Sequence, residues 1–136
     1  MTRERVKRQL AWMGGWGRPS GATLLIYHRV GGGSRDERDV TAARFAEQVE
    51  RLTQAPVVSL DAALDRLDAG EEEPSVVLTF DDGFGDVYDH AWPLLREAGL
   101  PFTLYAATGY LGGTMHWDGS TARDTGAPAL ECEQLG

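Results

Sequence analysis

The sequence places two adjacent carboxylates, Asp81 and Asp82, between an apolar run and Gly83. Two ionised carboxylates that leave a buried strand together repel one another unless a cation lies between them. A divalent metal removes this repulsion, because its charge dominates the local electrostatics. One carboxylate can then bind the metal while the other acts as a base towards metal-bound water. Glycine tolerates positive φ, so Gly83 could turn the chain and direct both side chains into one cleft.

A polar turn is the simpler interpretation of Asp81-Asp82-Gly83, because Asp-Gly is a common turn sequence. The residues that follow have a helical pattern, which disfavours the hairpin version of this interpretation. Residue types alone leave both interpretations open.

Five further side chains are candidates for binding, and each has a simpler alternative. His28 follows an apolar run and either contacts a substrate or makes a local hydrogen bond. Tyr110 and Trp117 could each stack on a sugar ring or pack against the protein. His90 is expected on a helix surface and His116 in a polar loop. Of these five, His28 and Tyr110 are predicted to contact the substrate.

Four apolar runs predict strands that would position these residues. The predicted strands are 22–28, 56–58, 75–80 and 102–107. The third run shows no polar alternation, which is typical of a parallel strand covered on both faces. Strands that alternate with helices predict an α/β fold with parallel strands and right-handed crossovers. The carboxyl ends of such strands share one edge, so His28, Asp81 and Tyr110 are expected to converge there.

Three amphipathic patterns predict the helices. They cover residues 41–53, 59–70 and 86–98, with Thr41, Ser59 and Asp86 as predicted N-caps. In the first helix, apolar residues recur at i, i+4 and i+7, at positions 45, 49 and 52. Pro93 either kinks the third helix or marks the first turn of its main segment. The glycine-rich and charged stretch 31–39 is predicted to be a mobile linker, and a further helix is predicted near 130–135.

Composition excludes several classes of protein. The length of 136 residues suits one domain. The net charge of −8 argues against a nucleic-acid-binding face, which would be basic. Lys7 is the single lysine, so phosphate-loop and Schiff-base chemistry have no candidate. Cys132 is the single cysteine, which excludes an intrachain disulfide or a cysteine-based zinc site.

The first 20 residues are predicted to be a basic N-terminal arm. Residues 9–15 do not form the apolar core of a secretory signal, and no apolar run is long enough to span a membrane. We therefore expect a soluble chain, cytoplasmic as written, or in the cell envelope if a longer form is exported.

Residues 79–83, TFDDG, resemble the first motif of the polysaccharide deacetylases, the NodB-homology carbohydrate esterases. The resemblance covers about residues 22–115, through LIYHRV at 25–30, VVSL at 57–60, AWPLL at 91–95, GLPFT at 99–103 and ATGYLG at 107–112. The Tyr-His-Arg-Val sequence at 27–30 is most similar to the branch that acts on bacterial poly-N-acetylglucosamine.

This resemblance implies a hydrolase that uses a divalent metal, zinc or a similar ion, to remove N-acetyl or O-acetyl groups from a bacterial polysaccharide. Asp81 would be the general base and Asp82 a metal ligand. The family's two histidine ligands lie in a later motif, His-[Ser/Thr]-x-x-x-His, which this sequence lacks. We therefore expect residues 21–136 to form the first part of a distorted (β/α) barrel, with about four β/α units. Alone, it should bind metal weakly or not at all and could self-associate through exposed barrel edges.

Two alternatives stay open beside this interpretation. One is a catalytically inactive carbohydrate-binding or regulatory remnant of the same fold. The other is an unrelated receiver-like phospho-acceptor domain, which the lack of any lysine after the predicted strands disfavours.

Overall fold

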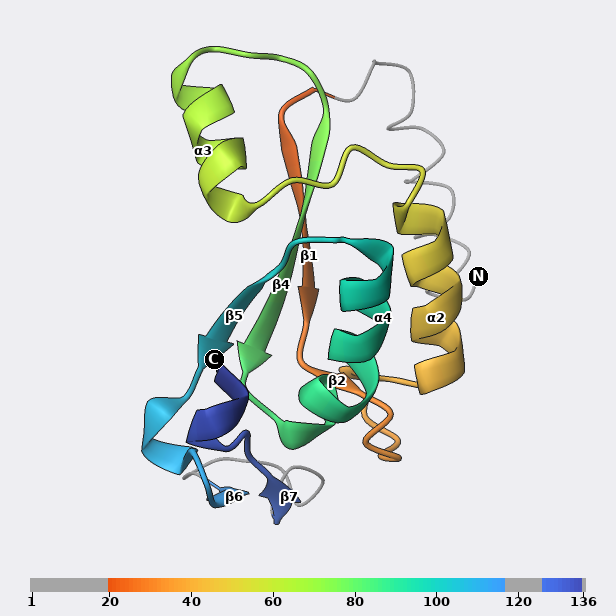
Figure 1. Cartoon of the computed structure of the whole chain (residues 1–136), viewed down its shortest axis with the longest axis vertical. Helices are drawn as coiled ribbons and strands as arrows, with labels where there is room; N and C mark the ends of the chain where they lie inside the picture. The colour runs from red at the N-terminus through yellow and green to blue at the C-terminus, as the bar shows by residue number, and fades with distance from the viewer. Residues whose placement is uncertain (1–19, 117–125, 136) are drawn as a thin grey trace, which may run out of the picture.

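A three-stranded parallel sheet forms the centre of the molecule (Figure 1). The computed structural model describes residues 20–116 and 126–135. The sheet has the order β1-β4-β5 and consists of β1 (Ala22–Tyr27), β4 (Ser75–Asp82) and β5 (Thr103–Ala106). The helices are α2 (Ala42–Leu52), α3 (Leu60–Asp68) and α4 (Trp92–Ala98), with a π-helical turn, η1 (Val87–Ala91), before α4. Helices α2 and α4 pack on one face of the sheet, while α3 lies beside the beginnings of β1 and β4 (Figure 1).

The register of the sheet determines which strand ends meet. Tyr27 of β1 lies beside Phe80 of β4, so the chain leaves the last rung with His28 next to Asp81. On the other side of β4, Asp82 lies beside Ala106 of β5. The predicted convergence of His28 and Asp81 at the carboxyl edge is therefore confirmed.

The core lies between this sheet and the two helices. Alternate residues of β4, Leu78 and Phe80, are fully buried against the helices. The predicted apolar face of α2, Phe45, Val49 and Leu52, is buried there as well. Aromatic rings fill the centre, with ring centroids 5.2 Å apart for Tyr27 and Phe80. Pairs of this geometry add about 0.5–1.5 kcal/mol beyond the burial of their area.

The prediction of a second strand at residues 56–58 is wrong. Residues 56–58 make a single bridge, Val57 to Val76, so the sheet has three strands and not four. Pro56 has no N–H to donate, and Ser59 begins α3 immediately by accepting a hydrogen bond from the Ala62 N–H at 3.2 Å. The segment therefore leaves the sheet after one pairing.

The predicted cap at Asp86 is also wrong. Thr41 caps α2 as predicted, accepting a hydrogen bond from the Arg44 N–H at 3.3 Å. Asp86 instead has αR geometry and makes no capping hydrogen bond, because its carboxylate binds Arg29 and the Val30 N–H. Pro93 lies in the first turn of α4, which confirms one of its two predicted roles.

The segment predicted as a linker and the chain after β5 contain short elements. Within 31–39, Asp39 organises the loop by accepting hydrogen bonds from the N–H groups of Gly32 and Ser34, at 3.0 and 2.7 Å. The predicted C-terminal helix is one 3₁₀ turn. The short elements are β2 (Arg29–Val30), β3 (Asp39–Val40), η2 (Thr108–Tyr110), β6 (Thr114–Met115), β7 (Ala127–Pro128) and η3 (Cys132–Leu135).

The second face of the sheet exposes large apolar side chains. Leu24, Ile26 and Tyr105 are 49%, 61% and 53% exposed, although Val77 and Thr79 of β4 on this face are buried. Thus the central strand is covered on both faces as predicted, while its neighbours are not. The described residues include no helix long and apolar enough to cross a membrane, and the predicted basic arm lies outside them except for Ser20.

We expect this apolar face to drive self-association, since exposed patches of this kind favour association. Ile26→Thr should shift the elution volume in size-exclusion chromatography towards the monomer and lower the fluorescence of the apolar dye ANS. Leu67→Thr is the matched control, because Leu67 is similarly exposed but lies on α3. Equal effects of the two substitutions would contradict a specific role of the sheet face.

Candidate active site

Asp81 and Asp82 lie at the carboxyl end of β4, in a tight turn with an unusual backbone. Asp82 has φ +71°, and among the described residues it alone has positive φ without being glycine. Gly83 follows with φ +82°, as its predicted role requires, and its N–H donates to the Asp81 carbonyl at 2.9 Å. This i→i+2 hydrogen bond around a residue of positive φ describes a rare, strained γ-turn. Such a conformation costs about 1–3 kcal/mol and is typical of functional sites.

Neighbouring backbone holds this turn in place. The Asp82 carbonyl accepts from the Ala107 N–H and the Gly83 carbonyl from the Leu130 N–H, each at 2.9 Å. A side chain at position 83 would also contact Ala106, because an ideal Cβ there lies 3.3 Å from its Cα and Cβ. Segments far apart in the sequence therefore fix the direction of both carboxylates.

His28 and Asp81 form a pair on the open face of the sheet. Their Nε2 and Oδ2 atoms are 3.8 Å apart, which is an ion-pair distance and too long for a hydrogen bond. Both side chains stay accessible, at 27% and 36% exposure. A ligand could therefore reach both groups at once, and contact of His28 with the substrate stays a prediction.

A second pair, Arg29 and Asp86, is largely buried and lies close in the sequence to His28 and to the Asp81-Asp82 turn. The Arg29 Nε donates to Asp86 Oδ2 at 2.8 Å, and the Val30 N–H donates to Oδ1 at 3.2 Å. The guanidinium also lies 4.8 Å from the centre of the Phe84 ring. Sequence reasoning missed this pair, although a charged residue after an apolar run, as in the LLIYHRV sequence at 24–30, indicates a buried partner.

Burial raises the pKa of Asp86 above its ordinary value, and the charge of Asp39 adds to this. The hydrogen bonds and positive charge from Arg29 and Val30 act in the opposite direction without cancelling it. Burial likewise raises the pKa of Tyr27, whose hydroxyl donates to Gln48 Oε1 at 3.1 Å.

The other predicted binding residues are placed differently. Tyr110 packs against the small cluster of Phe84 and Met115, with its ring centroid 5.7 Å from that of His116. The packing alternative for Tyr110 is thus realised, while a role in substrate binding stays untested. His116 is exposed, and its Nδ1 lies 3.2 Å from the Thr114 carbonyl. His90 is exposed on η1, and Trp117 lies outside the described residues.

Comparison with known proteins identifies the family. The sequence profile described as "Polysaccharide deacetylase" matches residues 68–124, which include both carboxylates. Among solved structures, IcaB from Ammonifex degensii is 29% identical, with a TM-score of 0.68 over 85% of this chain and 47% of its own. The chain matches part of a polysaccharide deacetylase domain in sequence and in fold. The predicted family and partial (β/α) barrel are thereby confirmed.

Two further solved structures share this fold. A de-N-acetylase from Aggregatibacter actinomycetemcomitans is 19% identical, with a TM-score of 0.65 over 84% of this chain and 48% of its own. The Streptococcus pyogenes deacetylase PplD, solved with acetate, is 23% identical, with a TM-score of 0.64 over 87% of this chain and 51% of its own. The chain thus spans about half the length of the solved structures that it matches. No curated protein sequence matches the chain.

The described residues do not fit a complete metal site. Residues 20–116 and 126–135 contain no cluster of three or more histidine, cysteine, aspartate or glutamate side chains that could hold an ion. A catalytic zinc ion needs three protein ligands beside its open position. Asp82 is the one ligand that the resemblance assigns, so no step of the chemistry is assigned to a metal here.

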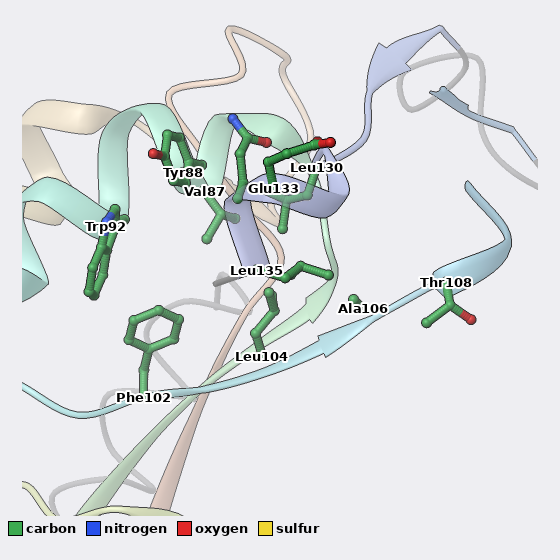
Figure 2. Close-up of a pocket in the computed structure, with 11 residues that line it drawn as sticks. Val87, Tyr88, Trp92, Phe102, Leu104, Ala106, Thr108, Leu130, Glu133 and Leu135 are labelled. Carbon is green, nitrogen blue, oxygen red and sulfur yellow. The ribbon is translucent and has the colours of Figure 1, made fainter. Parts of the chain in front are cut away.

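An apolar pocket of about 760 Å³ lies between the helix-covered face of β5, the helical segment η1–α4 and the C-terminal segment. Figure 2 shows side chains of η1, α4 and β5 facing those of the C-terminal segment across this space. Leu104 and Ala106 of β5 line the pocket. Asp81 pairs with Tyr105, the residue between them, whose side chain lies on the opposite face of the sheet. The pocket lining includes neither Asp81 nor His28, so the pocket is separate from the candidate active site.

We expect Asp82→Gly to stabilise the domain by about 1 kcal/mol, because glycine adopts positive φ without strain. Urea denaturation measures the free energy of unfolding. Asp81→Gly is the matched control: it removes a neighbouring carboxylate from a position without positive φ, and should destabilise. Similar losses of stability in both variants would contradict the strain at Asp82.

Asp86 should make stability depend on pH. Its folded-state pKa lies above the ordinary value of 3.8, so the folded chain binds this proton more tightly. The corresponding stability is present at low pH and is lost as pH rises from 3.8 through the folded pKa. Urea denaturation across this range should therefore show the unfolding free energy of the wild type falling relative to that of Asp86→Asn. A relative increase would mean that the Arg29 ion pair outweighs the effect of burial.

Proposed function

We propose that this site belongs to a metal-dependent deacetylase that hydrolyses N-acetyl, and in some substrates O-acetyl, groups of a bacterial polysaccharide. The observation that carries the proposal is the strained Asp81-Asp82 turn within the segment that matches the family. Strain of this kind persists where function requires a fixed direction of side chains.

Hydrolysis of an acetamide needs a base that takes a proton from water and an acid that gives one to the departing amine. Asp81 is the proposed base, because its carboxylate is accessible at the carboxyl edge of the sheet. His28, 3.8 Å away, would contact the same substrate, so that a proton held by this pair stays close to the reacting amide. The products are acetate and a free amino sugar.

Asp82 is the proposed ligand of a divalent cation, in the family zinc or a similar ion. The cation would polarise the acetyl carbonyl and water when bound. The described residues supply no further clustered donors for it, so binding by this chain alone should be weak or absent.

The proposed substrate is a polymer of the N-acetylglucosamine type. The Tyr-His-Arg-Val sequence at 27–30 supports this choice, together with the 29% identity to IcaB. Tyr110 is also proposed to contact the polymer. It lies three residues after Ala107, whose N–H donates to the Asp82 carbonyl and so connects this segment to the site. The net charge of −8 supports a partner other than nucleic acid.

This proposal can be tested with a chimera in which residues 20–116 replace the matching part of IcaB. It should release acetate from N-acetylglucosamine oligomers in the presence of zinc. Asp81→Asn should lower the rate about 10²–10⁴-fold, as loss of a general base does. Asp82→Asn should weaken zinc binding measured by calorimetry, whereas Asp89→Asn, at an exposed carboxylate on η1, serves as the control. A folded, zinc-loaded chimera that releases no acetate would contradict the proposal.

A non-catalytic carbohydrate-binding role is the second candidate, favoured by the lack of a metal-ligand cluster in the described residues. Under this role, the 136-residue chain would bind N-acetylglucosamine oligomers in calorimetry, and the chimera would bind them without releasing acetate. Binding lost in Tyr110→Ala would support it further.

A further inference from the structure

The buried pair Arg29–Asp86, together with Phe84, connects the two segments that supply the candidate active site. Arg29 directly follows His28, while Phe84 and Asp86 follow the Asp81-Asp82-Gly83 turn. We propose that this group, which we name the clasp, holds His28 against Asp81. Its members are positioning residues, and their importance rests on the function proposed above.

The need for such a device follows from the register of the sheet. The ladder between β1 and β4 ends at Tyr27 and Phe80, one residue before His28 and Asp81. No backbone pairing therefore fixes the distance between these two side chains. Beyond the ladder, the chain after β1 and the chain after β4 are joined by the 3.8 Å pair of His28 and Asp81. They are next joined by the hydrogen bonds that the Arg29 side chain and the Val30 N–H donate to Asp86.

The clasp has the properties of a rigid connection. One carboxylate accepts from the Arg29 Nε at 2.8 Å and from the Val30 N–H at 3.2 Å, so it orients both a side chain and the backbone. Arg29 is 6% exposed and Val30 is fully buried. Charge-assisted hydrogen bonds that are shielded from water are stronger than exposed ones. The guanidinium also lies over Phe84, which follows Gly83 in the strained turn.

Gly32 covers the clasp from the other side. An ideal Cβ at this position would overlap the Arg29 Nη2 and lie 2.7 Å from the Asp86 Oδ2. A methyl group there must displace both side chains, although neither charge is removed. Gly32→Ala is therefore a second, independent way to disturb the clasp.

Cross-linking in the full 136-residue chain tests the proposal without requiring activity. In a Cys132→Ser background, His28→Cys and Asp81→Cys are combined and the rate of disulfide formation is measured under mild oxidation. Adjacent strands lie about 4.8 Å apart, which is within the Cα range of about 4.4–6.8 Å for a disulfide. A second pair, Ile26→Cys with Thr79→Cys, joins register partners inside the ladder and is the matched control.

We expect Asp86→Ala and Gly32→Ala to slow cross-linking of the 28–81 pair about tenfold or more, because a displacement of about 1 Å has effects of this size on proximity-controlled reactions. The rate for the 26–79 pair should stay unchanged. Asp86→Asn keeps an acceptor oxygen and should restore most of the 28–81 rate, which a loss of general stability would not predict.

The proposal is overturned if the 28–81 rate is unaffected in both variants. It is also overturned if both cysteine pairs slow equally, because the clasp would then support the whole sheet and not the site. A negative result in the acetate assay leaves this geometric readout unchanged, so failure of the proposed function and failure of the clasp are distinguishable.

Discussion

The hydrogen bonds that β4 makes on both of its edges are the constraint on which the rest of this structure depends. They fix the strand between β1 and β5, so that Leu78 and Phe80 face the helices while Val77 and Thr79 face the opposite side. The same register brings two neighbouring strand ends to the Asp81-Asp82 turn. Core and candidate active site are therefore consequences of one pairing pattern, which explains how a partial barrel keeps its site residues together.

The turn after β4 stores strain that its surroundings compensate. Positive φ at Asp82 is unfavourable, yet the two carbonyls of the turn are held by N–H groups of Ala107 and Leu130. Buried backbone groups strongly prefer to be paired, so these bonds cannot be given up without loss. The conformation of Asp82 is thus determined by segments more than 20 residues away in the sequence. A strained residue that is held so firmly indicates selection for direction rather than for stability.

The two faces of the sheet have different roles. One face carries the aromatic core and is covered by α2 and α4, and beside it lies the apolar pocket near η3. The other face carries Leu24, Ile26 and Tyr105 and leads to Asp81 at its carboxyl edge. In a (β/α) barrel this second face would be the interior, where side chains normally pack in layers. The chain spans about half of the matched structures, and this partial fold leaves the interior face exposed. The described residues likewise include no complete cluster of metal donors.

The sequence by itself determined the α/β class, the N-caps at Thr41 and Ser59, and the positions of Asp81 and Asp82. These features depend on local chemistry, because a cap or an apolar run is encoded within a few residues. Only the tertiary structure decided that residues 56–58 make a single bridge and that Asp82 has positive φ. Likewise, it turned Asp86 from a predicted cap into the partner of Arg29, 57 residues away. A buried guanidinium competes for a carboxylate more strongly than a helix N-terminus does, and local sequence does not reveal that competition.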